Sequence, residues 1–201
     1  MQYTWLVILW LLFGAMHSVF AATKIKLWAS GIMKGRYRYH RPVYSLFATV
    51  NLLVIVWYHF SLTPVLLWKN TVAEKTIAVL ICVPALLVMG ISIKKYFMYL
   101  SGVDVFLKHR PAIVPHLEQT GLHAYMRHPL YFGTLLFVWC ILLWQPSVSN
   151  LISCCCITLY TIVGTVFEER KLVTEFGSEY MLYAKRVPML VPGIKLRGLK
   201  I

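Results

Sequence analysis

Five apolar stretches without Lys, Arg, Asp or Glu divide the chain, and polar or basic segments separate them. The first stretch, Tyr3–Ala22, has 20 residues and is long enough to cross a bilayer as a helix. Shorter stretches can still reach both interfaces of a hydrocarbon layer of about 30 Å when their polar flanks extend outward. The pattern therefore predicts an all-α integral membrane protein with about five transmembrane helices. The four later stretches have 16 to 18 residues each and are Val43–Phe60, Thr76–Ile93, Leu130–Gln145 and Leu151–Phe167.

Local signals refine this arrangement of spans. Pro84 lies inside the third stretch and predicts a kink there. The fourth and fifth stretches are joined by only "PSVSN", which predicts a tight helical hairpin. The first stretch lacks the basic flank that precedes a signal-peptide core, so we expect a membrane span rather than a cleaved signal.

The distribution of charge predicts an orientation. The segments 24–41, 94–127 and 168–201 hold 6, 5 and 7 of the 20 Lys and Arg residues, whereas segment 61–75 holds two. By the positive-inside rule, the N-terminus lies outside and the C-terminus lies in the cytoplasm. The formal net charge of +13 is thereby explained as a topology signal, reinforced by anionic lipid headgroups, and it indicates no nucleic-acid partner.

The composition excludes several other classes of protein. With 59% hydrophobic and 13% charged residues, the 201-residue chain is too apolar for a soluble domain and fits one membrane domain over residues 1–201. The five cysteines lie in apolar runs without a CxxC pair, so we expect neither disulfides nor a zinc site. The seven histidines lack the dense clusters of a membrane di-iron site, and no metal centre is predicted.

The tail after the fifth stretch predicts a cytoplasmic amphipathic helix. Gly177 predicts an interruption or bend in this helix, and Pro188 predicts its end. The residues on one face of this helix recur at four-residue spacing. They are Glu168, Leu172, Phe176 and Tyr180.

A cluster of polar residues precedes the fourth stretch in "AYMRHPLYFG". An arginine in such a place can be a simple interfacial anchor. Here, however, Pro129 fixes the helix start, and Gly133 permits the close approach of another backbone or of a ligand. Together with Arg127, His128 and Tyr131, these residues are typical of an anion-binding helix N-terminus.

Two acids end the fifth stretch. Glu168 and Glu169 can form weak exposed salt bridges with neighbouring cations, or they can face Arg127 across the hairpin. The short hairpin turn favours the second arrangement, because it brings the cytoplasmic ends of both spans together. His17, inside the first span, is either a functional intramembrane group or a neutral hydrogen-bonded histidine.

These motifs resemble the isoprenylcysteine carboxyl methyltransferase family over residues 119–192. The resemblance rests on "TGLHAYMRHPLYFG" and "EERKLVTEFGSEYMLYAKRVPMLVP", which agree with the family's RHPxYxG and EExxL…FGxxYxxYxxRVP motifs in order and spacing. His123 departs from the tyrosine that family members usually carry. The N-terminal half, with "HSVFAATKIKLW" and "RYHRPVYSLFATVNLL", resembles the NnrU and methanethiol S-methyltransferase branch of the same superfamily.

The resemblance implies a membrane methyltransferase that uses S-adenosyl-L-methionine without a Rossmann domain. Residues 1–98 would form the substrate or scaffold part, and residues 119–192 the cofactor part. Arg127 and Glu168 would be the catalytic residues. The implied cofactor-binding residues are Gly121, His123, Tyr125, Arg127, His128, Pro129, Tyr131, Glu168, Glu169 and Tyr180.

The chemistry of the cofactor agrees with this set of residues. Arg127 can bind the cofactor's carboxylate bidentately, while Glu168 or Glu169 binds its ammonium or ribose hydroxyls. The aromatic rings of Tyr131 and Tyr180 can pack on the adenine or act as interface aromatics.

The acceptor would be a small thiol, such as methanethiol, or a lipophilic carboxylate of the prenylcysteine kind. A carboxylate needs no base. A thiol needs one, and His128, Glu168 or His17 can serve.

Two alternatives remain. Sterol and steroid reductases use a related element with NADPH, but they usually show HPNY where this chain has "HPLY" around Leu130. They also carry a tryptophan where this chain has "EYMLY". A non-enzymatic membrane protein would use the same residues only for packing and anchoring.

Overall fold

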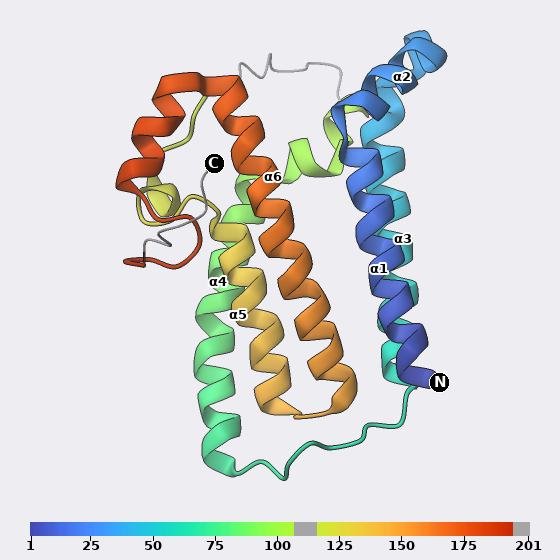
Figure 1. The fold of residues 1–201 in the computed structure, drawn as a ribbon, viewed down its shortest axis with the longest axis vertical. Coiled ribbons are helices and arrows are strands. Elements are labelled where there is room, and N and C mark those ends of the chain that lie inside the picture. Colours follow the sequence, from blue (N-terminus) through green and yellow to red (C-terminus); the bar gives the residue numbers. More distant parts are fainter. Residues whose placement is uncertain (107–115, 195–201) are drawn as a thin grey trace.

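The computed structural model describes residues 1–106 and 116–194, and every regular element in these ranges is a helix (Figure 1). The predicted all-α membrane class is confirmed, because four helical segments are long and apolar enough to span a bilayer and a shorter apolar helix, Pro129–Trp144, accompanies them. The helices are α1 (Gln2–Ala21), α2 (Thr23–Met33), α3 (His40–Ser61), α4 (Val72–Ser101), α5 (Pro129–Trp144) and α6 (Val148–Arg186), with short 3-10 turns η1 (Lys34–Tyr39), η2 (Val103–Phe106) and η3 (Gly121–Ala124).

The helices differ from the predicted spans mainly at their ends. The basic segment 24–41, which separates the first two apolar stretches, contains α2 and η1. Leu27, Trp28 and Ile32 of α2 are exposed, as in an interfacial amphipathic helix whose apolar side meets lipid. Helix α4 passes through Pro84 and continues to Ser101. The basic residues at 108, 110 and 195–200 lie outside the described residues.

Helix α6 joins the fifth span to the tail. It starts at a cap in which the Ser147 hydroxyl accepts a hydrogen bond from the Asn150 N–H, and it ends after Arg186. The predicted bend is confirmed, because Gly177 has φ 55° and ψ −128°, a conformation that favours glycine. Beyond this break the chain turns back toward the start of α5 (Figure 1).

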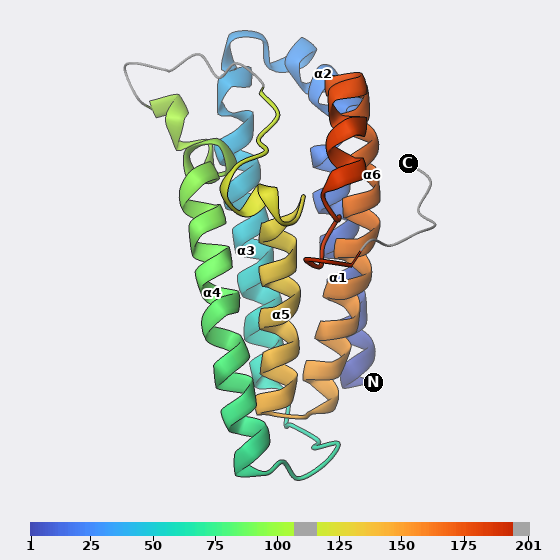
Figure 2. The same cartoon turned by 90° about the vertical axis from the view of Figure 1, so that its left-hand side faces the viewer.

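The spans form two neighbouring groups. Helices α4, α5 and α6 lie side by side, and α1 with α3 packs beside α6 (Figures 1 and 2). The N-terminus and the 62–71 connection lie at one end of the bundle, whereas α2 and the tail lie at the other. This agrees with the relative placement expected from the charges. Which end is cytoplasmic stays a prediction.

A polar network fixes α1, α3 and α6 together inside the bundle. The Trp10 indole donates to the Ser153 hydroxyl at 3.0 Å, and His59 Nδ1 lies 3.1 Å from the same hydroxyl. His59 Nε2 lies 2.9 Å from the Asn150 side-chain oxygen. Both ring nitrogens of His59 therefore have partners, which is how a buried polar group is usually accommodated.

Gly133 of α5 lies in close contact with α4. A Cβ atom at this position would lie 2.8 Å from the Met89 Cγ, 3.1 Å from the Ala85 carbonyl oxygen and 3.2 Å from the Met89 backbone nitrogen. Of the two uses that the sequence allowed for Gly133, the structure supports close approach to another backbone. Small residues at such crossings let membrane helices approach closely.

We expect Gly133→Ala to destabilise the protein, because the added methyl group meets backbone atoms of α4 that cannot move independently. Overpacking of this kind costs about 1–3 kcal/mol. The measurement is the free energy of unfolding in detergent. Gly90→Ala is the matched control, since a Cβ at Gly90 has no atom of a neighbouring element within 4 Å. Equal stability of the two variants would contradict the close α4–α5 contact.

Candidate active site

The two sequence motifs meet through their backbones. The N–H groups of Arg127 and His128 donate to the carbonyl oxygens of Pro188 and Met189 at 2.9 and 3.1 Å. The segment that precedes α5 is thereby held against the segment that follows α6. The predicted meeting of the motifs at the ends of the hairpin is confirmed.

Glu169 lies at the centre of this contact and is 1% exposed. Arg127 donates from Nε to its Oε1 atom at 2.8 Å and from Nη2 to its Oε2 atom at 2.7 Å. The Nη1 group of the same arginine donates to the carbonyl oxygens of Ala184 at 2.9 Å and Val187 at 2.6 Å. Arg127 therefore binds both the acid and the last turn of α6.

Two further side chains complete the Glu169 cluster. His128 Nε2 lies 2.7 Å from Glu169 Oε1, and the Tyr180 hydroxyl donates to the same oxygen at 2.5 Å. Glu169 follows the charge-free part of α6. Burial by itself raises its pKa, but hydrogen bonds from its three partners outweigh this effect and lower the pKa to about 2. The acid is therefore ionised and paired throughout the physiological pH range.

This cluster gives Arg127 and Glu169 different roles from those expected from the sequence. Glu169 occupies the bidentate face of Arg127 that the sequence assigned to a cofactor carboxylate. Arg127 has five N–H donors, and the four hydrogen bonds described above leave one for a ligand. Tyr180 is 1% exposed and directs its hydroxyl at Glu169, so in this structure its ring offers no free face.

Glu168 has a different environment from its neighbour. Its side chain is 42% exposed, and its Oε2 atom lies 3.6 Å from His128 Nδ1. The Tyr131 phenol also interacts electrostatically with it. Both ring nitrogens of His128 thus face carboxylates, which leaves Glu168 as the accessible acid of the pair.

Open space borders α6 beside Glu168. Tyr160, Gly164 and Glu168 recur at four-residue spacing and form one stripe along the helix. A Cβ at Gly164 would have no atom of a neighbouring element within 4 Å. We call these three residues the α6 stripe. Sequence reasoning missed Tyr160 and Gly164, although their spacing from Glu168 was a usable signal.

The remaining predicted residues surround this region. His123 Nε2 lies 3.1 Å from the Tyr96 hydroxyl, and its Nδ1 lies 3.1 Å from the Arg127 carbonyl oxygen. This histidine connects α4 to the motif. Gly121 has φ 59° and is exposed, and Tyr125 is 67% exposed. Pro129 is buried as the first residue of α5. The Tyr131 ring stacks on His128, with ring centroids 5.5 Å apart.

The fold and this cluster define a multi-pass membrane protein with a charged, partly open site where its helices end. The chain matches the NnrU protein family over residues 5–193, and it belongs to that family. This confirms the resemblance inferred from the motifs.

Several named proteins are similar to this chain. Methanethiol S-methyltransferase 1 of Bradyrhizobium diazoefficiens is 29% identical over 188 residues, which cover 90% of this chain and 64% of that protein. Methanethiol S-methyltransferase of Pseudomonas deceptionensis is 28% identical over 194 residues, covering 94% and 72%. Human protein-S-isoprenylcysteine O-methyltransferase is 31% identical over 124 residues, covering 58% and 41%. No solved structure matches this chain.

We expect Glu169→Gln to destabilise the protein strongly. The amide keeps the shape of the side chain but leaves the Arg127 guanidinium without its anion, and breaking a buried pair costs about 3–5 kcal/mol. The free energy of unfolding in detergent measures this. Glu175→Gln, at an exposed position of the same helix, is the control and should change stability little. If both variants unfold alike, the cluster does not hold the tail in place.

Proposed function

We propose that this protein is an S-adenosylmethionine-dependent membrane methyltransferase with a small thiol as its methyl acceptor. The observation that carries the proposal is the accessible Glu168 carboxylate next to the open space at Gly164. The names of the relatives support methyl transfer, and the methanethiol S-methyltransferases cover more of this chain than the isoprenylcysteine enzyme does.

The residues present fit this cofactor. Its ammonium and ribose hydroxyls need an acceptor that is not already neutralised, and Glu168 meets that requirement because Arg127 pairs with Glu169 instead. The cofactor is large and needs a stretch of helix surface that no side chain covers, and Gly164 provides such a position. The remaining N–H of Arg127 can donate to its carboxylate.

A second source of positive charge lies nearby. Lys26 of α2 interacts electrostatically with Lys171 of α6 and with Arg41 at the start of α3. Lys171 follows Glu168 by less than one helical turn. A basic residue close to the accessible Glu168 suits a zwitterionic ligand, and these cations also attract anionic lipid headgroups.

The reaction suits a water-poor site. When bound, S-adenosylmethionine supplies an electrophilic methyl group on a positively charged sulfur. A thiolate that approaches it loses its charge as the new bond forms, so a low dielectric disfavours the separated ions more than the transition state. The protein's part is to hold the acceptor in line, where orientation is worth about 7–11 kcal/mol at best.

Titration of the purified protein with S-adenosylhomocysteine tests the cofactor site. We expect saturable binding that Gly164→Leu weakens at least about 10-fold, equivalent to about 1.4 kcal/mol, because the new side chain fills the space beside Glu168. Gly90→Leu, in an equally open but exposed position on α4, should bind as the wild type does. Binding of NADPH in place of S-adenosylhomocysteine would overturn the proposal in favour of a reductase.

A further inference from the structure

Three cations from three different helices converge near the end of the bundle that carries the site. Lys26 of α2 interacts electrostatically with Arg41, in the first turn of α3, and with Lys171 of α6. We call Lys26, Arg41 and Lys171 the cation cluster. His40 also interacts electrostatically with Lys26. Because like charges repel, this arrangement costs stability unless an anion lies among them.

The protein itself does not supply that anion to the two lysines. Within the part of the chain that the structure describes, no acidic side chain forms an ion pair with Lys26 or Lys171. Acids are scarce throughout, with 7 Asp and Glu against 20 Lys and Arg in the whole sequence. The cation cluster is therefore suited to an anion from outside the chain.

Helix α2 places the cluster at the membrane surface. Leu27, Trp28 and Ile32 are 67%, 66% and 61% exposed, and they form the apolar outer side of the helix. Successive residues of a helix are about 100° apart, so Lys26 lies on the other side, together with the buried Ala29. A helix with such an apolar side lies in the interface, at the depth of the lipid headgroups. Lys26 is thus directed toward the bundle at that depth.

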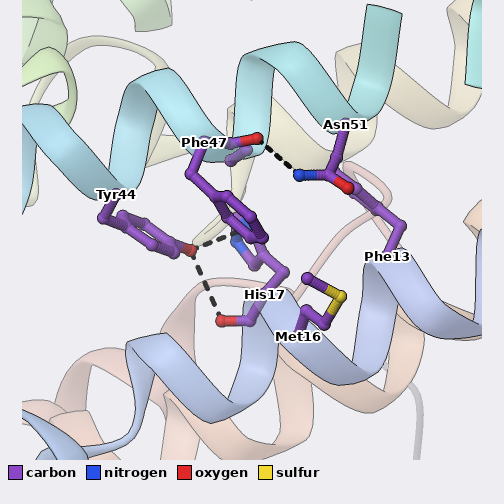
Figure 3. A pocket seen from close by; sticks show the side chains of 7 residues that line it. Phe13, Met16, His17, Tyr44, Phe47 and Asn51 are labelled. Atoms are coloured by element: carbon purple, nitrogen blue, oxygen red, sulfur yellow. Dashed lines mark hydrogen bonds between the residues drawn. The ribbon is translucent and has the colours of Figure 1, made fainter. Parts of the chain in front are cut away.

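Lys26 and Arg41 belong to one unit of the structure, because α2 connects α1 to α3 and these two helices are joined. His17 Nδ1 of α1 lies 2.9 Å from the Tyr44 hydroxyl of α3, as Figure 3 shows. Apolar side chains surround this contact, namely Phe13, Met16 and Phe47. Lys171 belongs to the other unit, since it lies on α6. An anion held by the cation cluster would therefore bridge the two units.

We propose that the cation cluster binds the phosphate group of an anionic phospholipid, which bridges α2 and α3 to α6. The proposal goes beyond methyl transfer, which it does not require. The Arg41 guanidinium matches phosphate oxygens with paired N–H donors, and the two lysines add compact positive charges. The acyl chains of the lipid lie along the apolar outer side of α2.

The charges around the cluster favour a lipid over a free anion. Four further cations of the same basic segment are exposed, and they are Lys24, Lys34, Arg36 and Arg38. Basic residues next to a membrane attract anionic lipids and raise their local concentration. A zwitterionic lipid carries its own cation, so phosphatidylcholine neutralises the cluster less well than phosphatidylglycerol does.

Thermal unfolding of the full chain in lipid nanodiscs tests this site. The two membranes are pure phosphatidylcholine and an equal mixture of phosphatidylcholine and phosphatidylglycerol. The wild type should have the higher Tm in the mixture. Lys26→Gln should raise the Tm slightly in phosphatidylcholine, because it removes a repelling charge. In the mixture it should lower the Tm by about 2–4 °C, because it removes a contact to the phosphate. Lys171→Gln, on the other unit, should show the same reversal of sign.

Lys24→Gln is the matched control, since it removes the same charge from the same helix. Lys24 precedes Trp28 by four residues and therefore lies on the outer side, away from the cation cluster. Its substitution should not raise the Tm in phosphatidylcholine. A reversal of sign in this control as well would reduce the effect to diffuse attraction and overturn the site.

Three other results would also contradict the proposal. The first is a change of the same sign in both membranes for Lys26→Gln. The second is inorganic phosphate that stabilises the wild type in pure phosphatidylcholine as much as phosphatidylglycerol does, which would identify the ligand as a free anion. The third is a loss of S-adenosylhomocysteine binding by Lys26→Gln in both membranes, which would assign the cluster to the cofactor.

Discussion

The architecture of the site depends on the buried negative charge of Glu169. An ionised carboxylate is stable in so little water only if cations and hydrogen-bond donors surround it. Its donors come from the start of α5 and from the tail beyond Gly177. Arg127 also satisfies carbonyl groups in the last turn of α6, which a helix end leaves without partners. One acid thus joins two helix ends and closes the tail over the bundle.

The neighbouring acid is free for a different role for a geometric reason. Consecutive residues of a helix point in directions about 100° apart, so Glu168 and Glu169 meet opposite nitrogens of His128, and only Glu169 also reaches Arg127 and Tyr180. With Glu169 turned inward, Glu168 is directed along the stripe that contains Gly164 and Tyr160. The two neighbouring acids therefore have separate roles. Glu169 forms the buried cluster, and that cluster holds Glu168, the accessible acid, in position.

The sequence predicted those features that depend on local chemistry. Charge-free stretches located the spans, the short "PSVSN" turn located the hairpin, and Gly177 located the bend. It did not separate Glu168 from Glu169, because identical residues carry no sign of which one is buried. It missed α2, where lysines alternate with exposed Leu27 and Trp28. The pairing of His17 with Tyr44 joins residues 27 positions apart on different helices, which no periodicity reveals.

Burial between the helices determines which hydrogen-bond partners the histidines of this fold require. An imidazole taken out of water needs partners for both nitrogens, and His59, His123 and His128 have them. A ring nitrogen without a protein partner costs stability unless a ligand or water uses it. At His17, Nδ1 contacts the Tyr44 hydroxyl at 2.9 Å, and the ring packs edge-on against Tyr160 of the α6 stripe.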